Sequence, residues 1–184
     1  MPETNRPNKN VILILKALKI VNDEGINIKL VTTGKMEACN STAEFIKGNS
    51  DLVVELSDLS MKELFCLYYY SEMVVCPNII EGLGISAQCL EALSISKPVI
   101  HAKSMGVSES LKNVGLNFDT AKLNWVELDD YIGLANKITY VLNNHEEVVR
   151  SQRNVYEAYS KLTWKDVANE YICIFEKCQI GKNR

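Results

Sequence analysis

The chain has 184 residues, of which 47% are hydrophobic, and a formal net charge of −3 with an isoelectric point near 5.5. This length and composition predict one domain with a substantial apolar core, and the acidic balance argues against a nucleic-acid-binding platform. The six cysteines include no Cys-x-x-Cys pair, so we expect neither a disulfide framework nor a metal site. No apolar run is long enough to span a membrane, and the first residues lack a signal-peptide core. We therefore expect a cytoplasmic protein. Any peripheral attachment to a membrane is expected to involve parts outside this chain.

From the N-terminus, amphipathic segments alternate with short apolar runs. In chain order they predict a helix at 11–24, a strand at 28–32, a helix at 41–48, a strand at 51–56, a helix at 60–70, a strand at 73–76, a helix at 87–95 and a strand at 98–101. A short helix near 108 and a small strand at 115–118 follow, and the remainder predicts helices at 129–142, 145–160 and 164–178. Ser41 and Ser60 each open a Ser-x-x-Glu capping box.

Strands and helices that alternate in this way predict a parallel sheet with right-handed crossovers, a Rossmann-like α/β fold with helices on both faces. In such sheets ligands bind outside the carboxyl ends of the strands. The segments that follow the predicted strands are rich in small, polar and glycine residues: 33–35, 57–58, 77–86 and 101–109. The sequence therefore predicts a ligand-binding edge there.

The most informative of these segments is 77–98. Glu81, Gly82 and Gly84 follow an apolar strand, and Glu91 lies in the first turns of the next helix. Glycines let a backbone approach a ligand closely, and a helix N-terminus offers free N–H groups to a phosphate. Carboxylates accept hydrogen bonds from sugar hydroxyls. The segment thus favours a pocket for an anionic ligand rich in hydroxyl groups.

The same segment resembles the donor-binding segment of retaining glycosyltransferases with the GT-B fold. The matching residues are Glu81, Gly82, Gly84, Glu91, Ala92, Pro98 and Val99. There are two departures from the family pattern. The two glutamates are two residues further apart than usual, and Ser96 stands where the family has a glycine.

The resemblance covers about residues 5–178 and implies that residues 1–184 form a single domain, the C-terminal, nucleotide-sugar-binding domain of a GT-B enzyme. The first strand of that domain and the N-terminal acceptor-binding domain are then expected to lie outside this chain, in the same protein or in a partner. The implied activity of the full-length enzyme is transfer of a sugar from a nucleotide diphosphate to a hydroxyl acceptor, with anomeric retention. We expect no metal or other cofactor, and no transfer by this chain alone.

The resemblance also assigns expected roles to individual residues. Arg6 and Lys9 would bind the donor diphosphate and stabilise its charge during transfer, and Glu81 would lie near the donor sugar. Glu91 would bind the ribose hydroxyls. The other residues expected to bind the donor, chiefly through backbone groups, are Gly34, Gly82, Gly84, Ile85 and Ser86.

Two alternatives to a glycosyltransferase remain open. One is a nucleotide- or nucleotide-sugar-binding module without transfer activity, which the missing acceptor half favours for the isolated chain. The other is a domain similar to a sugar-nucleotide epimerase. Among residues that attract attention, we interpret His101 as a core histidine and Trp164 as a packing residue. The run 68–70 of three tyrosines is interpreted as part core and part helix surface.

Overall fold

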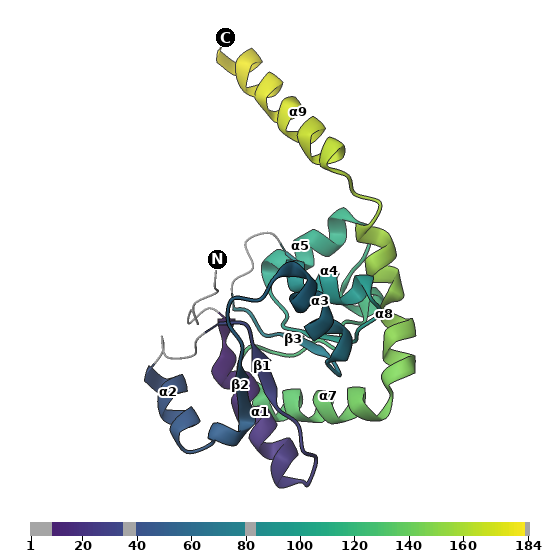
Figure 1. Ribbon diagram of the computed structural model, residues 1–184. Helices are drawn as coiled ribbons and strands as arrows, with labels where there is room; N and C mark the ends of the chain where they lie inside the picture. Colours follow the sequence, from purple (N-terminus) through teal and green to yellow (C-terminus); the bar gives the residue numbers. More distant parts are fainter. Residues whose placement is uncertain (1–8, 35–39, 80–83, 183–184) are drawn as a thin grey trace.

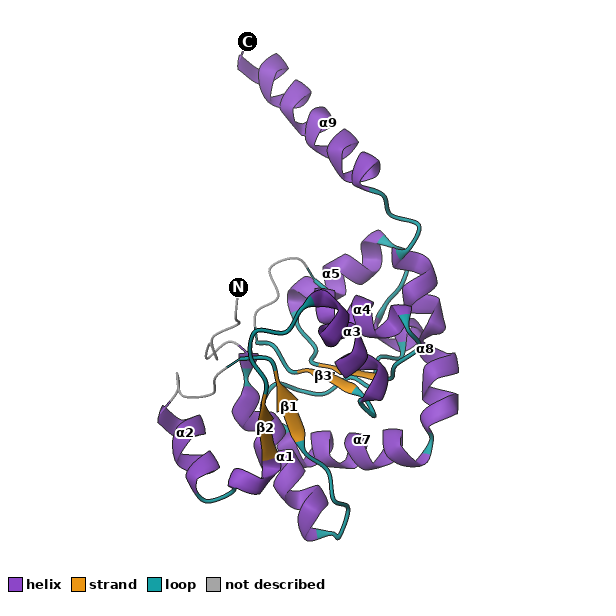
Figure 2. Cartoon of the chain, in the orientation of Figure 1, coloured by secondary structure: helices purple, strands orange, loops and turns teal. Residues whose placement is uncertain are grey.

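The computed structural model describes residues 9–34, 40–79 and 84–182. Its strands form two parallel pairs (Figure 2). In the first pair, β1 (Leu30–Thr32) lies beside β2 (Val53–Glu55), and in the second, β3 (Val74–Cys76) lies beside β4 (Val99–His101). A further parallel bridge joins Ala102 to Val126. Each of these strands falls inside a predicted one, and the predicted parallel pairing is confirmed.

Helices account for most of the described chain (Figure 1). Their bounds are α1 Val11–Asp23, α2 Asn40–Lys47, α3 Met61–Tyr70, α4 Ala87–Ser94, α5 Met105–Asn113, α6 Phe118–Ala121, α7 Tyr131–Asn143, α8 His145–Tyr159 and α9 Trp164–Lys182, with a 3-10 turn η2 at Ser50–Leu52. Ser60 caps α3 with the predicted capping box, in which its hydroxyl accepts from the Glu63 N–H and its own N–H donates to the Glu63 carboxylate.

Strand β4 is buried on both faces, because successive side chains of a strand point to opposite sides. Ile100 packs in a cluster with apolar residues of α1 and α7. Val99 packs in a second cluster with residues of α4, α5 and α8. Helices therefore cover both faces of the sheet at β4, and the predicted Rossmann-like α/β arrangement is confirmed.

One predicted strand does not form, and two predicted helices form but begin earlier than expected. The strand expected at 115–118 does not form, because the Asn117 side chain accepts hydrogen bonds from the N–H groups of Asp119 and Thr120 and starts α6. Helix α5 begins at Met105, before the expected position. Helix α2 already includes Asn40, so Ser41 lies inside the helix that it was expected to cap.

The last helix, α9, extends away from the rest of the molecule (Figure 1). Trp164 at its start is 87% exposed, so the prediction that this ring packs is wrong; no described element lies against it. Other apolar side chains of α9 are exposed as well: Val167, Tyr171, Ile172, Ile174 and Phe175. Within the described residues, no helix is both long and apolar enough to cross a membrane.

Candidate functional site

Six of the nine residues expected to bind or act on a ligand lie in the described part of the chain. They are Lys9, Gly34, Gly84, Ile85, Ser86 and Glu91. Arg6, Glu81 and Gly82 lie outside the described residues. The described six come from three separate places along the chain: before α1, after β1, and from residue 84 into α4.

Gly84 has a backbone that only glycine adopts easily, with φ at +97°. A Cβ at this position would also collide with the Ser110 side chain of α5 and lie 3.2 Å from the carbonyl oxygen of Gly106. The glycine therefore lets the chain approach α5 closely just before α4 begins. This packing accounts for the glycine without any ligand.

Ser86 is the N-cap of α4 and is buried. Its hydroxyl accepts from the Cys89 N–H and donates to the Cys76 sulfur, with both heavy-atom distances 3.3 Å. These two bonds fix the start of α4 against the end of β3. The side chain of the preceding residue, Ile85, is buried in the core. Backbone N–H groups in the first turn of α4 are then the groups that this segment can offer to an anion.

Glu91 lies on the second turn of α4 and is half-buried. Its Oε2 accepts a hydrogen bond from the Tyr68 hydroxyl of α3, at 2.9 Å. Tyr68 is 8% exposed, whereas Tyr69 and Tyr70 are exposed, as the interpretation of this tyrosine run expected. The tyrosine thus fixes one oxygen of the carboxylate. Sequence reasoning missed this contact, because nothing in the sequence links two residues on different helices.

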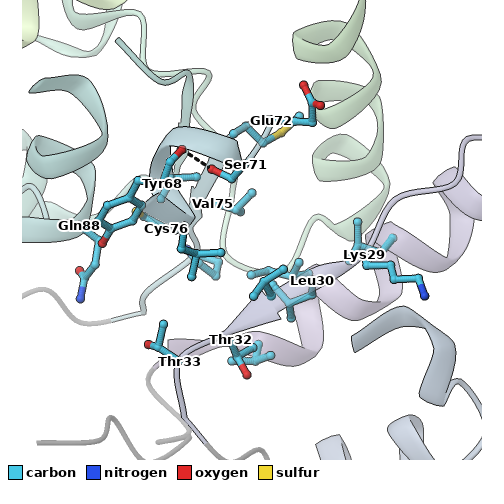
Figure 3. A pocket seen from close by; sticks show the side chains of 18 of the residues that line it. Lys29, Leu30, Thr32, Thr33, Tyr68, Ser71, Glu72, Val75, Cys76 and Gln88 are labelled. Atoms are coloured by element: carbon cyan, nitrogen blue, oxygen red, sulfur yellow. Dashed lines mark hydrogen bonds between the residues drawn. The ribbon is translucent and has the colours of Figure 1, made fainter. Parts of the chain in front are cut away.

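A cavity of about 530 Å³ lies between β1 and β3. Figure 3 shows its two ends: Thr33, Cys76 and Gln88 lie at one, and Lys29 and Glu72 at the other. The first end is where β1 and β3 terminate, as predicted for the ligand-binding edge. Other residues that line the cavity and belong to that edge are Lys9, Gly34, Pro77 and Asn78. Between the ends the cavity is mainly apolar.

His101 is a core residue, as interpreted from the sequence. It is fully buried, and its Nδ1 lies 2.8 Å from the carbonyl oxygen of Ala102, so this nitrogen carries the proton. Its ring contacts Trp125 at 5.7 Å between centroids. Burial lowers the pKa of His101, which keeps the ring neutral at physiological pH. The ring does not line the cavity.

Comparison with known proteins finds relatives along most of the chain. Residues 3–159 match the family model described as glycosyl transferases group 1. The chain is 25% identical over 174 residues to the lipopolysaccharide 1,2-N-acetylglucosaminetransferase of Salmonella typhimurium. That match covers 90% of this chain and 44% of that protein. It is 28% identical over 178 residues to the MMP alpha-(1->4)-mannosyltransferase of Mycolicibacterium hassiacum, covering 93% of this chain and 40% of that protein. The chain thus spans less than half the length of these relatives.

Comparison with solved structures finds similar folds along most of the chain. The crystal structure of TarM matches with a TM-score of 0.74 at 16% identity, covering 95% of this chain and 34% of that one. The catalytic domain of the cholesterol-alpha-glucosyltransferase from Helicobacter pylori matches with a TM-score of 0.63 at 19% identity, covering 88% of this chain and 96% of that one. The fold is therefore that of a GT-B domain, as expected.

Proposed function

Because the chain belongs to the glycosyl transferases group 1 family, we propose that it is the donor-binding half of a retaining glycosyltransferase. The full-length enzyme would move a sugar from a nucleotide diphosphate to a hydroxyl acceptor. The observation that carries the proposal is the hydrogen bond between Glu91 of α4 and Tyr68 of α3, because Tyr68 lines the cavity between β1 and β3.

Glu91 is suited to bind a ribose. Tyr68 occupies one lone pair of Oε2, and within the described residues no hydrogen bond reaches Oε1. An ionised carboxylate offers about four lone-pair sites, so enough remain for two neighbouring hydroxyl groups. Holding the side chain in place before the ligand arrives reduces the entropy lost on binding.

The diphosphate would bind where positive charge and free N–H groups meet. Lys9 lines the cavity, and α4 begins after its N-cap Ser86 with the N–H groups of a helix N-terminus. Arg6, three residues before Lys9 in the sequence, would add a planar donor for the phosphate oxygens. In transfer these groups would stabilise the negative charge that develops on the leaving diphosphate, without a metal. Glu81 would lie near the donor sugar.

A second candidate function is binding of a nucleotide or nucleotide sugar without transfer. One observation favours it for this chain by itself: the chain spans only 44% and 40% of the two curated relatives. Transfer requires an acceptor held in line with the donor, and no acceptor site is assigned to the described residues.

Isothermal titration with UDP, GDP and ADP, each with and without EDTA, tests donor binding. We expect saturable heat with at least one of the three nucleotides and no change on adding EDTA. The absence of heat with every nucleotide at millimolar concentration would contradict the proposal, and binding abolished by EDTA would contradict its metal independence.

A further inference from the structure

The turn that leads into α4 lies directly against α5. The atoms nearest to the place that a Cβ on Gly84 would occupy belong to the Ser110 side chain, followed by the carbonyl oxygen of Gly106. Gly106 and Ser110 are four residues apart and thus lie on the same face of α5. The Ser110 side chain therefore determines how the backbone at Gly84 rests on α5.

The Ser110 hydroxyl has a partner on a third helix. Its Oγ lies 2.5 Å from the hydroxyl oxygen of Tyr159, the last residue of α8. A serine inside a helix can instead donate to the carbonyl four residues earlier, which here belongs to Gly106. A serine side chain has three staggered rotamers, and the bond to Tyr159 favours the one that the structure shows against Gly84.

Tyr159 is itself held in place by packing. Its ring is half-buried and packs against the apolar cluster that includes Val155 of α8, Cys89 of α4 and Leu111 of α5. Burial raises the pKa of the Tyr159 hydroxyl, so this group keeps its proton at neutral pH. An anchored ring with a protonated hydroxyl is a stable partner for Ser110.

The residues that follow Gly84 are fixed by other contacts. Ile85 buries its side chain in the same cluster, and the Ser86 hydroxyl donates to the Cys76 sulfur at the end of β3. Gly84 has no side chain with which to anchor itself, and glycine has the greatest backbone freedom of any residue. Its contact with Ser110 therefore restricts the turn on the side that faces α5.

We propose that Tyr159 is a positioning residue for the donor: through Ser110 it holds the turn at Gly84, and with it the first N–H groups of α4, where the diphosphate binds. The inference rests on the proposed function, in which those N–H groups meet the diphosphate. Groups that are fixed before an anion arrives lose less entropy when they bind it. Tyr159 thus supports binding of the diphosphate and not of the nucleoside.

Tyr159→Phe removes the hydroxyl and keeps the buried ring. The test is NMR titration of the full chain with the best-binding nucleoside diphosphate and, separately, with the corresponding nucleoside. We expect the variant to bind the diphosphate about three- to tenfold more weakly, as for the loss of one hydrogen bond. The affinity for the nucleoside is expected to stay unchanged, whereas a general loss of structure would weaken both ligands alike.

Hydrogen exchange without any ligand measures the positioning separately. The Cys89 N–H donates to Ser86 Oγ, so its exchange rate reports how firmly the start of α4 is held. We expect Tyr159→Phe to speed exchange of the Cys89 amide by about threefold or more. The amides of Ile138 and Val141 in α7 are expected to exchange at unchanged rates, which would show that the effect is local.

Two further variants serve as controls. Tyr156→Phe removes a hydroxyl from the same helix at a position that is 38% exposed, and we expect it to change neither affinity nor exchange. Ser110→Ala removes the other hydroxyl of the pair and is expected to act like Tyr159→Phe. The double variant is expected to bind the diphosphate no more weakly than either single variant, because the two hydroxyls act as one unit.

Three results would overturn the role of Tyr159 while leaving donor binding intact. They are equal weakening of nucleoside and diphosphate, additive losses in the double variant, and unchanged exchange at Cys89 beside normal nucleotide binding. If the unmodified chain binds no nucleotide, the proposed function is overturned and the role of Tyr159 in donor binding falls with it.

Discussion

At the residue scale, Glu91 carries the proposed contact with ribose, and replacing it tests that role. We expect Glu91→Ala to weaken nucleotide binding by about tenfold or more, because a hydrogen bond to a charged group contributes about 1.5–3 kcal/mol. Glu91→Gln is expected to weaken it less, since the amide keeps one acceptor oxygen. The helix is expected to survive, because alanine is a better helix former than glutamate.

Glu157→Ala is the matched control for this measurement. Glu157 is exposed on α8, where it pairs with Arg153, and α8 carries none of the residues expected to bind the donor. We expect it to leave nucleotide affinity unchanged. If Glu91→Ala also leaves affinity unchanged while the thermal midpoint shows an intact fold, Glu91 is a surface residue and not a ligand for ribose.

Tyr68 acts through Glu91 and is therefore a positioning residue. Tyr68→Phe removes the hydroxyl that donates to Glu91 at 2.9 Å and keeps the buried ring. We expect nucleotide affinity to fall several-fold, by about 1 kcal/mol, as the carboxylate gains freedom. Tyr69→Phe, at a neighbouring position that is 62% exposed, is expected to have no effect. Titration of the double variant Tyr68→Phe with Glu91→Ala decides the mechanism: additive losses would show that the two side chains act independently.

At the element scale, the Gln152 side chain makes hydrogen bonds to the edge of β4 that a neighbouring strand would otherwise make. Gln152 of α8 is fully buried and pairs with both backbone groups of Val99 in β4. Gln152→Leu would leave a buried N–H and a buried C=O without these partners, each costing about 1–3 kcal/mol. We expect the free energy of unfolding, measured with urea, to fall by roughly 2–5 kcal/mol.

Arg153→Ala on the exposed face of the same helix is the control. It removes only the surface pair with Glu157, so we expect a change below about 0.5 kcal/mol. Equal losses for the two variants would show that the Gln152 bonds to β4 do not stabilise the fold.

Local patterns predict the elements of this chain well where the cause is itself local. The Ser60 capping box, the apolar run of β4 and the helix at 131–143 follow from sequence spacing alone. The strand expected at 115–118 fails because a side-chain cap at Asn117 outweighs a weak strand pattern. The exposure of Trp164 could not be read from the sequence, because an apolar stripe does not reveal whether a partner surface is present.

Local patterns also predict where the candidate site lies, but they do not predict the contacts within it. Strand ends and glycines locate an edge of the sheet, and the structure gathers Lys9 and Gly34 at the end of one cavity. The bond between Tyr68 and Glu91 depends on how α3 packs against α4, which no local pattern contains. The roles of Arg6 and Glu81 remain predictions, because both residues lie outside the described part of the chain.

At the scale of the whole molecule, we expect no sugar transfer by this chain alone. The chain spans less than half of its curated relatives, and positioning of two reactants accounts for a large part of catalysis. The measurement is product formation from UDP-, GDP- and ADP-sugars with a panel of simple hydroxyl acceptors. Detection of product would show that the chain, alone or as an oligomer, builds its own acceptor site.

Mapping the nucleotide by NMR tests the central claim, donor binding at the edge where β1 and β3 end, most directly. Titration of the labelled chain with the best-binding nucleoside diphosphate is expected to shift the amide signals of Lys9, Gly34, Ser86 and Glu91 together, with one dissociation constant. A second hollow, lined by Lys103, Lys122 and Lys137 together with Asp119 and Glu147, is the alternative place for a phosphate to bind. Saturable shifts confined to that second hollow, or none at the strand ends, would contradict the account.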